Sequence, residues 1–427
     1  MKIFSEETCG QLLTRAFDER EKELAAVKEI LSAVRARGDR AVFEYEEKFD
    51  GTTLTQENFR VSEAEFAAAY AAVEPEFLES LKKAIDNVYG YHVRVGRQDT
   101  VRSANGRTTG YVVRAVERAG IYVPGGTAPL SSSVLMGVLP AKAAGVGRIV
   151  VVTPAKAGKI SPYTLVAAKE CGVDEVYKCG GAQAIAALAY GTESVPKVDV
   201  IAGPGNIFVT LAKKEVYGQV GIDMLAGPSE ILIVADSSAD PDYVAADVLS
   251  QAEHDVLARA IVITTDAALA EKIAAAVEEQ LARLPREPIA RKSIGTGGGI
   301  IVVNSLDRAC ALANEIAPEH LELYVKDPDA LLPGIRNAGA VFLGGYTPEP
   351  VGDYFAGPDH ILPTSGSAKF FQVLNEDIFT RKMSVISYTK DALLADGADI
   401  IRLAESEGLT AHANAVAIRM QKEGKKA

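Results

Sequence analysis

Long hydrophobic runs are missing from the sequence. No window approaches eighteen consecutive apolar residues, so no transmembrane helix is expected. The first residues, MKIFSEETCGQLL, carry acids where a signal peptide needs an apolar core, which favours a cytoplasmic protein. Basic residues are also in deficit, with 45 lysines and arginines against 57 aspartates and glutamates and no basic stripe. We therefore expect neither a nucleic acid nor a membrane as a partner.

Cysteine is scarce as well. The four cysteines, Cys9, Cys171, Cys179 and Cys310, match neither a CxxC redox pair nor the ligand spacing of a zinc knuckle. Scattered cysteines in a chain of 427 residues are typical of a reducing compartment, where they remain buried free thiols. We expect them to be inert.

What is present indicates a soluble α/β protein with several domains. Residues 1–116 are charged and mostly helical in pattern, and we expect this region to pack on the second of two Rossmann-like modules. Short β-branched runs alternate with helical patterns, which predicts a doubly wound fold. Because ten strands are more than one sheet of this kind usually holds, we predict two such modules, 117–232 and 233–388. Residues 389–427 are predicted to form a helical tail. The ten runs are AGIYV, RIVVVTP, EVYKC, VDVIAG, EILIVAD, AIVITT, GIIVVN, LELYV, AVFLG and SVISY.

Three glycine-rich turns follow strands of the first module. They are YVPGGTAPLSSS, KCGGAQAIAAL and IAGPGNIF, at residues 122–133, 178–188 and 201–208. Backbone N–H groups at the helix starts suit a phosphate or carboxylate, although no turn is a GxGxxG fingerprint. Each turn alone is weak evidence, since tight βα turns use glycine structurally. Together they favour a nucleotide or another anionic ligand at the carboxyl edge of the first sheet.

Polar residues gather in the second module and the tail. In LSQAEHD, residues 249–255, Gln251 and His254 lie three residues apart on a predicted helix that begins at Asp240-Pro241, so we expect one face to carry both, together with Asp247. A solvated polar face explains them, and so does half of a metal site. Other segments each place a histidine near a carboxylate: Glu319 with His320, Asp353 with His360, and Glu407 with His412. His92 has no such company and is interpreted as structural.

These residues suit two kinds of chemistry. Imidazoles with a carboxylate or amide from separate segments are what a zinc site with N and O ligands needs, although no HExxH pattern occurs. Glu319 and His320 could act as acid and base, but surface Glu-His pairs are common. They also precede the strand LELYV, whereas sites in open α/β sheets usually lie at carboxyl ends. Either that strand runs antiparallel or the site lies between domains.

Eight ordered motifs give a resemblance to a known family. PGGTAPL, GGAQAIAAL, GPGN, GPSE, SQAEHD, APEHLEL, GDYxxGxxH and LTAHxNA span roughly residues 110–420, and the sequence resembles histidinol dehydrogenases. The resemblance implies an oxidoreductase that uses NAD and one zinc ion per subunit. It would oxidise L-histidinol through L-histidinal to L-histidine, reducing two NAD in the last steps of histidine biosynthesis. It also implies a homodimer with shared active sites, in which the tail reaches the partner.

The resemblance also implies roles for individual residues. His320 would be the general base and Glu319 the residue that activates water. The implied zinc ligands are Gln251, His254, Asp353 and His412. The implied substrate contacts are Ser229, Gln251, His254, His320, Asp353, His360, Glu407 and His412. The implied NAD contacts are Tyr122, Gln183 and Asn206.

Two other interpretations stay open. A zinc hydrolase could use the same ligands, with Glu319 and His320 acting on metal-bound water, but it would leave the glycine turns unexplained. An enzyme like the aldehyde dehydrogenases would need a catalytic cysteine, and no cysteine lies beside the polar motifs.

Overall fold

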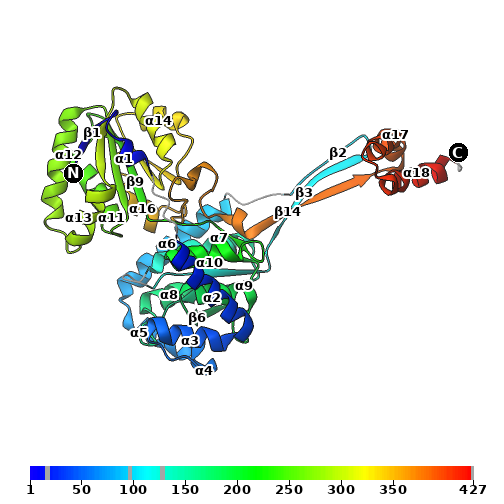
Figure 1. Cartoon of the computed structure of the whole chain (residues 1–427), viewed down its shortest axis with the longest axis horizontal. Helices are drawn as coiled ribbons and strands as arrows, with labels where there is room; N and C mark the ends of the chain where they lie inside the picture. The colour runs from blue at the N-terminus through cyan, green and yellow to red at the C-terminus, as the bar shows by residue number, and fades with distance from the viewer. Residues whose placement is uncertain (15–19, 95–98, 126–129, 425–427) are drawn as a thin grey trace. The chain divides into compact units, whose positions relative to one another are not determined.

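The computed structural model describes residues 1–14, 20–94, 99–125 and 130–424 (Figure 1). The chain divides into two compact units. The first unit comprises Met1–Val95 and Val116–Phe379, and the second comprises Gly96–Ala115 and Thr380–Ala427.

The first unit contains two parallel sheets, of which one has five strands in the order β6-β5-β4-β7-β8. Counted from β4, this order is 3-2-1-4-5, which is the strand order of a Rossmann sheet. The order reverses between β4 and β7. The glycine-rich segments begin after β4, β6 and β7 at the carboxyl edge, and residues 126–129 of the first lie outside the described part of the chain. The strands are β4 (Arg118–Tyr122), β5 (Arg148–Thr153), β6 (Glu175–Lys178), β7 (Val200–Ala202) and β8 (Gly221–Ile222).

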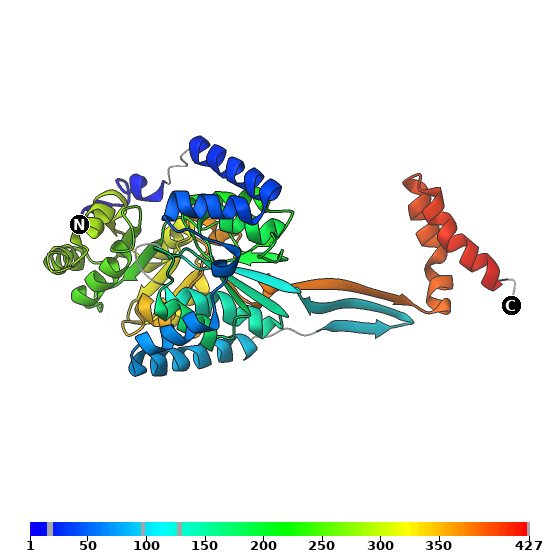
Figure 2. The ribbon, with the colours of Figure 1, turned by 90° about the horizontal axis from the view of Figure 1, so that it is seen from below.

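The helices of the N-terminal region pack against this first sheet, which corrects the prediction that they pack on the second module. α2 contacts α9 and α10, α5 contacts α8, and α6 contacts α7 (Figures 1 and 2). The reason is the apolar stripe of α2, which shares one core with α9. Among the described N-terminal elements, β1 (Ile3–Ser5) pairs with β11 of the second sheet, and α1 (Gly10–Leu13) packs in the core on that sheet. The helices are α2 (Glu21–Arg37), α3 (Asp39–Asp50), α4 (Gln56–Phe59), α5 (Glu63–Ala72), α6 (Pro75–Arg94), α7 (Ser131–Ala144), α8 (Pro162–Glu170), α9 (Gly181–Tyr190) and α10 (Ile207–Val216).

The other parallel sheet has six strands in the order β1-β11-β10-β9-β12-β13. Apart from the edge strand β1, it repeats the 3-2-1-4-5 order. LELYV lies in β12, which pairs in parallel with both β9 and β13, so the antiparallel alternative is wrong. The expected module border at 232/233 falls inside β9. The strands are β9 (Glu230–Ala235), β10 (Arg259–Thr264), β11 (Gly299–Val302), β12 (His320–Tyr324) and β13 (Ala340–Leu343).

Helices cover both faces of this six-stranded sheet. Alternate residues of β9 explain the two layers: Ile231 and Ile233 join the core of α11, α12 and α13, whereas Leu232 and Val234 join the core of α1 and α14. The second module is therefore doubly wound, as predicted. The remaining helices of the first unit are α11 (Pro241–Ala252), α12 (Ala267–Leu281), α13 (Glu287–Gly297), α14 (Leu306–Ile316), α15 (Pro328–Leu331) and α16 (Glu349–Tyr354), with the 3-10 helices η1 (Leu332–Gly334), η2 (Ser367–Lys369) and η3 (Glu376–Phe379).

The second unit combines an antiparallel sheet with two helices. Its strands, in the order β14-β3-β2, are β2 (Thr100–Ala104), β3 (Arg107–Ala115) and β14 (Thr380–Tyr388), and its helices are α17 (Lys390–Ser406) and α18 (Thr410–Gly424). SVISY therefore belongs to this sheet and not to the second parallel module, because it pairs with a strand in a region expected to be helical. The tail is helical, as predicted.

Among the described residues, no helix combines the length and the hydropathy that crossing a bilayer requires.

Candidate active site

The polar residues of the second module meet at the amino edge of its sheet. His320 is the first residue of β12 and pairs in register with Ile231, so it lies beside Glu230, the first residue of β9. Helix α11 returns from the carboxyl end of β9 to this edge and brings Gln251 there, one residue before the helix ends. Ser229, half-buried, directly precedes β9.

Two alternatives were expected, an antiparallel LELYV strand or a site between domains, and this location corresponds to the second. The chain that follows α16 runs from the amino edge of the second sheet into the core of the first, where Ile361 and Leu374 are buried. Gly227, just before β9, donates a hydrogen bond to Thr364 Oγ1 in that same chain segment. The site therefore lies where the two modules of the first unit meet.

His320 is held in one tautomer. Its Nδ1 lies 3.0 Å from the carbonyl oxygen of Glu230 and 3.0 Å from Oε1 of Gln251. Because a carbonyl oxygen can only accept, Nδ1 carries the proton and Nε2 carries the lone pair. Nε2 is buried and has no hydrogen-bond partner within the described part of the chain. Burial lowers the pKa of His320, so the ring is a neutral base with a free lone pair.

Glu319 lies beside this base and is also buried. Its Oε2 accepts a hydrogen bond of 2.8 Å from the backbone N–H of Glu230 and lies 3.7 Å from Nδ1 of His320. Burial raises the pKa of Glu319 well above its ordinary value, and the charges of Glu349, Glu230 and Asp353 raise it further. A carboxylate in this environment, once ionised, is a stronger base than one in water.

Glu349 is the residue at this site that the sequence analysis missed. Its Oε2 accepts a hydrogen bond of 3.0 Å from Oγ of Ser250, and its Oε1 lies 3.8 Å from Nδ1 of His320. Burial first, and then the charge of Asp353, raise the pKa of Glu349 to about 7. One feature of the sequence could have identified Glu349. It lies four residues before Asp353, which puts both carboxylates on one face of α16.

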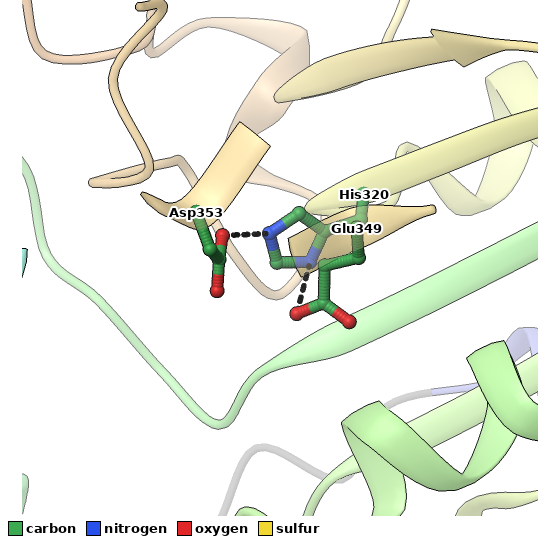
Figure 3. Close-up of side chains that lie close together, drawn as sticks. All are labelled: His320, Glu349 and Asp353. Carbon is green, nitrogen blue, oxygen red and sulfur yellow. Dashed lines mark ion pairs between the residues drawn. The ribbon is translucent and has the colours of Figure 1, made fainter. Parts of the chain in front are cut away.

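His320, Glu349 and Asp353 offer one group that could hold a metal ion. One ligand atom of each lies within 4.8 Å of the others, and Figure 3 shows the imidazole between the two carboxylates. Asp353 Oδ1 lies 3.9 Å from Nε2 of His320. Burial first, and then the neighbouring negative charges, raise the pKa values of Glu319 and Glu349, and a divalent cation would offset those charges.

His254 departs from the expectation that it shares a helical face with Gln251. Helix α11 ends at Ala252 with Glu253 as its C-cap, so Gln251 is buried inside the helix while His254 is exposed in the turn that follows. Burial is the main cause of the raised pKa of Glu349, and an electrostatic interaction with His254 opposes it.

The long loop after α16 contributes His360. Its Nδ1 lies 3.0 Å from the backbone oxygen of Asp353 and donates to it, which again leaves Nε2 with the lone pair. Burial lowers the pKa of His360. Asp353 and His360, seven residues apart in the sequence, are thus brought together as the motif suggested.

Glu407 and His412 belong to the second unit. Glu407 is the C-cap of α17 and His412 lies in α18, and both side chains are exposed. The cluster around His320 is therefore built entirely by the first unit.

The predicted NAD contacts lie at the carboxyl edge of the first sheet. Tyr122 ends β4, and its hydroxyl accepts a hydrogen bond of 3.2 Å from the N–H of Gly181. Gln183, two residues after Gly181, is buried. Asn206 caps α10 with its Oδ1, which accepts from the N–H groups of Phe208 and Val209, so Nδ2 is the atom it can offer a ligand.

Glycine is required at the start of the GPGN turn. Gly203 has φ +116°, and a Cβ there would lie 2.1 Å from the backbone oxygen of Tyr122. The turn and the end of β4 therefore approach more closely than any side chain permits.

His92 and the four cysteines lie outside the polar motifs, and the structure shows the surroundings of each. His92, interpreted as structural, is buried with its Nδ1 3.0 Å from Oε1 of Glu376. The four cysteines are free and buried, and burial raises the pKa of each thiol. Thiols of this kind are poor nucleophiles, which weighs against a catalytic cysteine.

Comparisons with known proteins agree with one another. A sequence model of the family described as histidinol dehydrogenase matches residues 13–420. The histidinol dehydrogenase of Heliobacterium mobile is 54% identical over 398 residues, 93% of each chain. That of Carboxydothermus hydrogenoformans is 54% identical over 398 residues, 93% of this chain and 94% of its own. The crystal structure of histidinol dehydrogenase from Elizabethkingia anophelis is 37% identical, covers 99% of both chains and superposes with a TM-score of 0.95.

Proposed function

The chain belongs to the histidinol dehydrogenase family, and from this premise we propose that it oxidises L-histidinol through L-histidinal to L-histidine, reducing two NAD in the last steps of histidine biosynthesis. The observation that carries the proposal is the buried, neutral His320, whose Nε2 lone pair has no partner among the described residues. A base of this kind is what removal of an alcohol proton requires. The free, buried cysteines support a cytoplasmic location, which we propose for this protein.

In the first oxidation, Nε2 of His320 takes the proton of the alcohol while the hydrogen on the same carbon leaves as hydride. Bound NAD would supply the acceptor for that hydride. The Nδ1–H bonds to Glu230 and Gln251 stabilise the ring as it gains charge, because both acceptors face the ring N–H. Tyr122, Gln183 and Asn206, at the carboxyl edge of the first sheet, are the residues proposed to hold the cofactor.

The second oxidation needs water. An aldehyde has to take up water before a second hydride can leave from the same carbon. Glu319 is the carboxylate proposed to take the proton of that water, since it lies 3.7 Å from the ring of His320 and its basicity is raised by burial.

The residues present fit a zinc ion. We propose Gln251, His254, Asp353 and His412 as its ligands, an N and O donor set that zinc accepts. Bound zinc would hold the imidazole and the amine of the substrate in place. The buried carboxylates around His320 support a cation here, and Ser229, His360 and Glu407 complete the proposed substrate contacts.

A homodimer would supply His412, the proposed zinc ligand that the first unit does not contain. The second unit buries few apolar side chains, chiefly Ala392 and Ala413, while several larger ones are exposed. Exposed large apolar side chains are typical of a surface that binds another protein. We propose that a second copy covers it, with the tail of each subunit bringing His412 and Glu407 to the partner's site. The larger exposed side chains are Met383, Ile386, Leu403, Leu409 and Ile418.

Metal removal tests this function. Prolonged chelation should abolish NAD reduction with L-histidinol, and Zn²⁺ should restore it, because the proposed ligands hold the substrate only through the metal. His254→Asn and His412→Asn should each lower the zinc content of a protein that unfolds at the wild-type temperature, whereas the exposed control Glu405→Gln should not. Full zinc occupancy in both histidine variants would refute the ligand assignment, and activity after complete chelation would refute the metal.

A further inference from the structure

A buried carboxylate at the carboxyl edge of the first sheet has no part in the function proposed above. Glu46, in α3, is buried, and its Oε1 accepts two hydrogen bonds. One comes from the N–H of Gly180 at 2.9 Å and the other from Nε2 of Gln183 at 2.8 Å. Both donors belong to the GGAQ turn that begins α9. Glu46, which belongs to the N-terminal region and not to the sheet, therefore binds this turn.

The bond to Glu46 sets the orientation of the Gln183 amide. Because Nε2 points to Glu46, Oε1 has to point the other way, and this oxygen is buried with no hydrogen-bond partner in the part of the chain that the structure describes. A buried acceptor without a donor is costly, and native proteins seldom leave one unpaired. A donor from a ligand would satisfy it.

The same turn is tied to the end of β4. The N–H of Gly181 donates to the hydroxyl of Tyr122, so the amides of Gly180 and Gly181 are bound to two different side chains. Glu46, Gln183 and Tyr122 therefore belong to one buried network, which joins the turn after β6 to the end of β4. The strand order reverses beside β4, and ligands bind at such a point in open α/β sheets.

We infer that Glu46 is a positioning residue of the cofactor site, which by binding Gly180 and Gln183 presents Oε1 of Gln183 to an N–H or O–H donor of NAD. The inference rests on the proposed function, in which Tyr122 and Gln183 contact NAD. Glu46 acts through Gln183 and does not itself touch the cofactor.

The acceptor role of Glu46 does not require its charge. Burial, and the neighbouring charge of Asp50, raise the pKa of Glu46 to about 8. The carbonyl oxygen of a neutral carboxyl group still accepts from both N–H donors, and so does the amide oxygen of glutamine. Glu46→Gln should therefore keep the network, whereas Glu46→Met, of similar length, removes the acceptor and leaves both donors unpaired.

The test is calorimetric titration of the zinc-loaded, full-length protein with NAD. We expect Glu46→Met to weaken NAD binding about tenfold, the loss of one well-placed hydrogen bond. Glu46→Gln, and the control Glu47→Gln at the exposed neighbouring position, should bind NAD as the wild type does. In turnover, Glu46→Met should raise the KM for NAD and leave the KM for L-histidinol and the zinc content unchanged.

A second variant and a double variant complete the test. If Glu46→Met does not fold, Glu46→Asp replaces it, because the shorter side chain cannot reach both donors and should weaken NAD binding. In a Gln183→Met background, the substitution of Glu46 should have no further effect on NAD binding.

Equal NAD affinity in the wild type and in the Met or Asp variant would overturn the inference. A double variant in which the losses of NAD affinity from Glu46 and from Gln183 multiply would also overturn it. Both outcomes leave the proposed function intact. A wild-type protein that binds no NAD would instead overturn the proposed function, and this inference with it.

Discussion

At the scale of single residues, the chemistry depends on which nitrogen of His320 carries the proton. The backbone oxygen of Glu230 fixes that choice, since it can only accept a hydrogen bond. Nε2 is left as a buried base, and Glu319 lies beside the ring with a raised pKa. We propose that these two adjacent residues serve two different steps.

Substituting these two residues should separate the steps. Glu319→Gln should slow the oxidation of L-histidinal far more than that of L-histidinol, because only the second step adds water. His320→Asn should slow both by about 10² to 10⁴, the contribution of a well-placed acid or base, with unchanged zinc content. Each half-reaction is assayed separately. Equal losses in both steps for Glu319→Gln would show that the roles cannot be divided this way.

Some of these residues could be found from the sequence and some could not. Glu319, His320 and Asp353 stand in short polar motifs that an apolar core does not explain. Glu349 and Glu46 look like ordinary surface acids in their helices, and only their folded contacts reveal them. Glu46 meets Gln183 across 137 positions, a pairing that a single sequence does not encode locally.

At the scale of elements, the predicted NAD site depends on the turns that follow the strands of the first sheet. The GPGN turn after β7 is clamped by a buried ion pair between Lys213 and Asp223. Oδ2 of Asp223 accepts from the N–H of Gly203 at 2.8 Å, and Nζ of Lys213 donates to the oxygen of Gly203 at 3.0 Å. Both polar groups of this glycine are therefore held by α10 and the segment that follows β8.

Removing Lys213 should destabilise the fold markedly. Lys213→Met leaves the carboxylate of Asp223 buried and unpaired, which costs about 3–5 kcal/mol of unfolding free energy. Adding Asp223→Asn should recover part of the loss, because the unpaired charge is gone. Denaturant unfolding measures this, with the exposed neighbour Lys214→Met as the control. Loss no greater than that of the control would mean that the pair contributes little.

The parallel strands were predictable, but the edge that carries the active site was not. Apolar runs such as EILIVAD identify strands that helices cover on both faces, and the structure places them so. The site nevertheless lies at the amino edge, because α11 returns there with Gln251 and β12 begins there with His320. In the second unit, β2 is exposed along its length and β3 is mostly half-buried, so the apolar pattern that marks strands elsewhere is weak.

At the scale of the whole molecule, we propose that a second copy of the chain completes the site. The first unit holds His320, Gln251 and Asp353, whereas His412 lies in the second unit. The resemblance to the family implied this sharing, but no periodicity or spacing in the sequence shows which chain supplies a ligand.

Mixed dimers test the sharing. Neither His254→Asn nor His412→Asn homodimers should be active. Co-expressed, half of the dimers carry one chain of each kind, and one of their two sites is then intact, so activity should return to about one quarter of wild type. Mixtures that stay inactive, although dimers of mixed composition form, would place both ligands in one chain.

The yield of NADH from a limiting amount of L-histidinol tests the central claim most directly. The account predicts two NADH for each L-histidinol consumed, with little free aldehyde, because His320 and Glu319 serve successive oxidations at one site. One NADH per substrate would mean an ordinary alcohol dehydrogenase. No NADH at all would contradict the account and favour a zinc hydrolase.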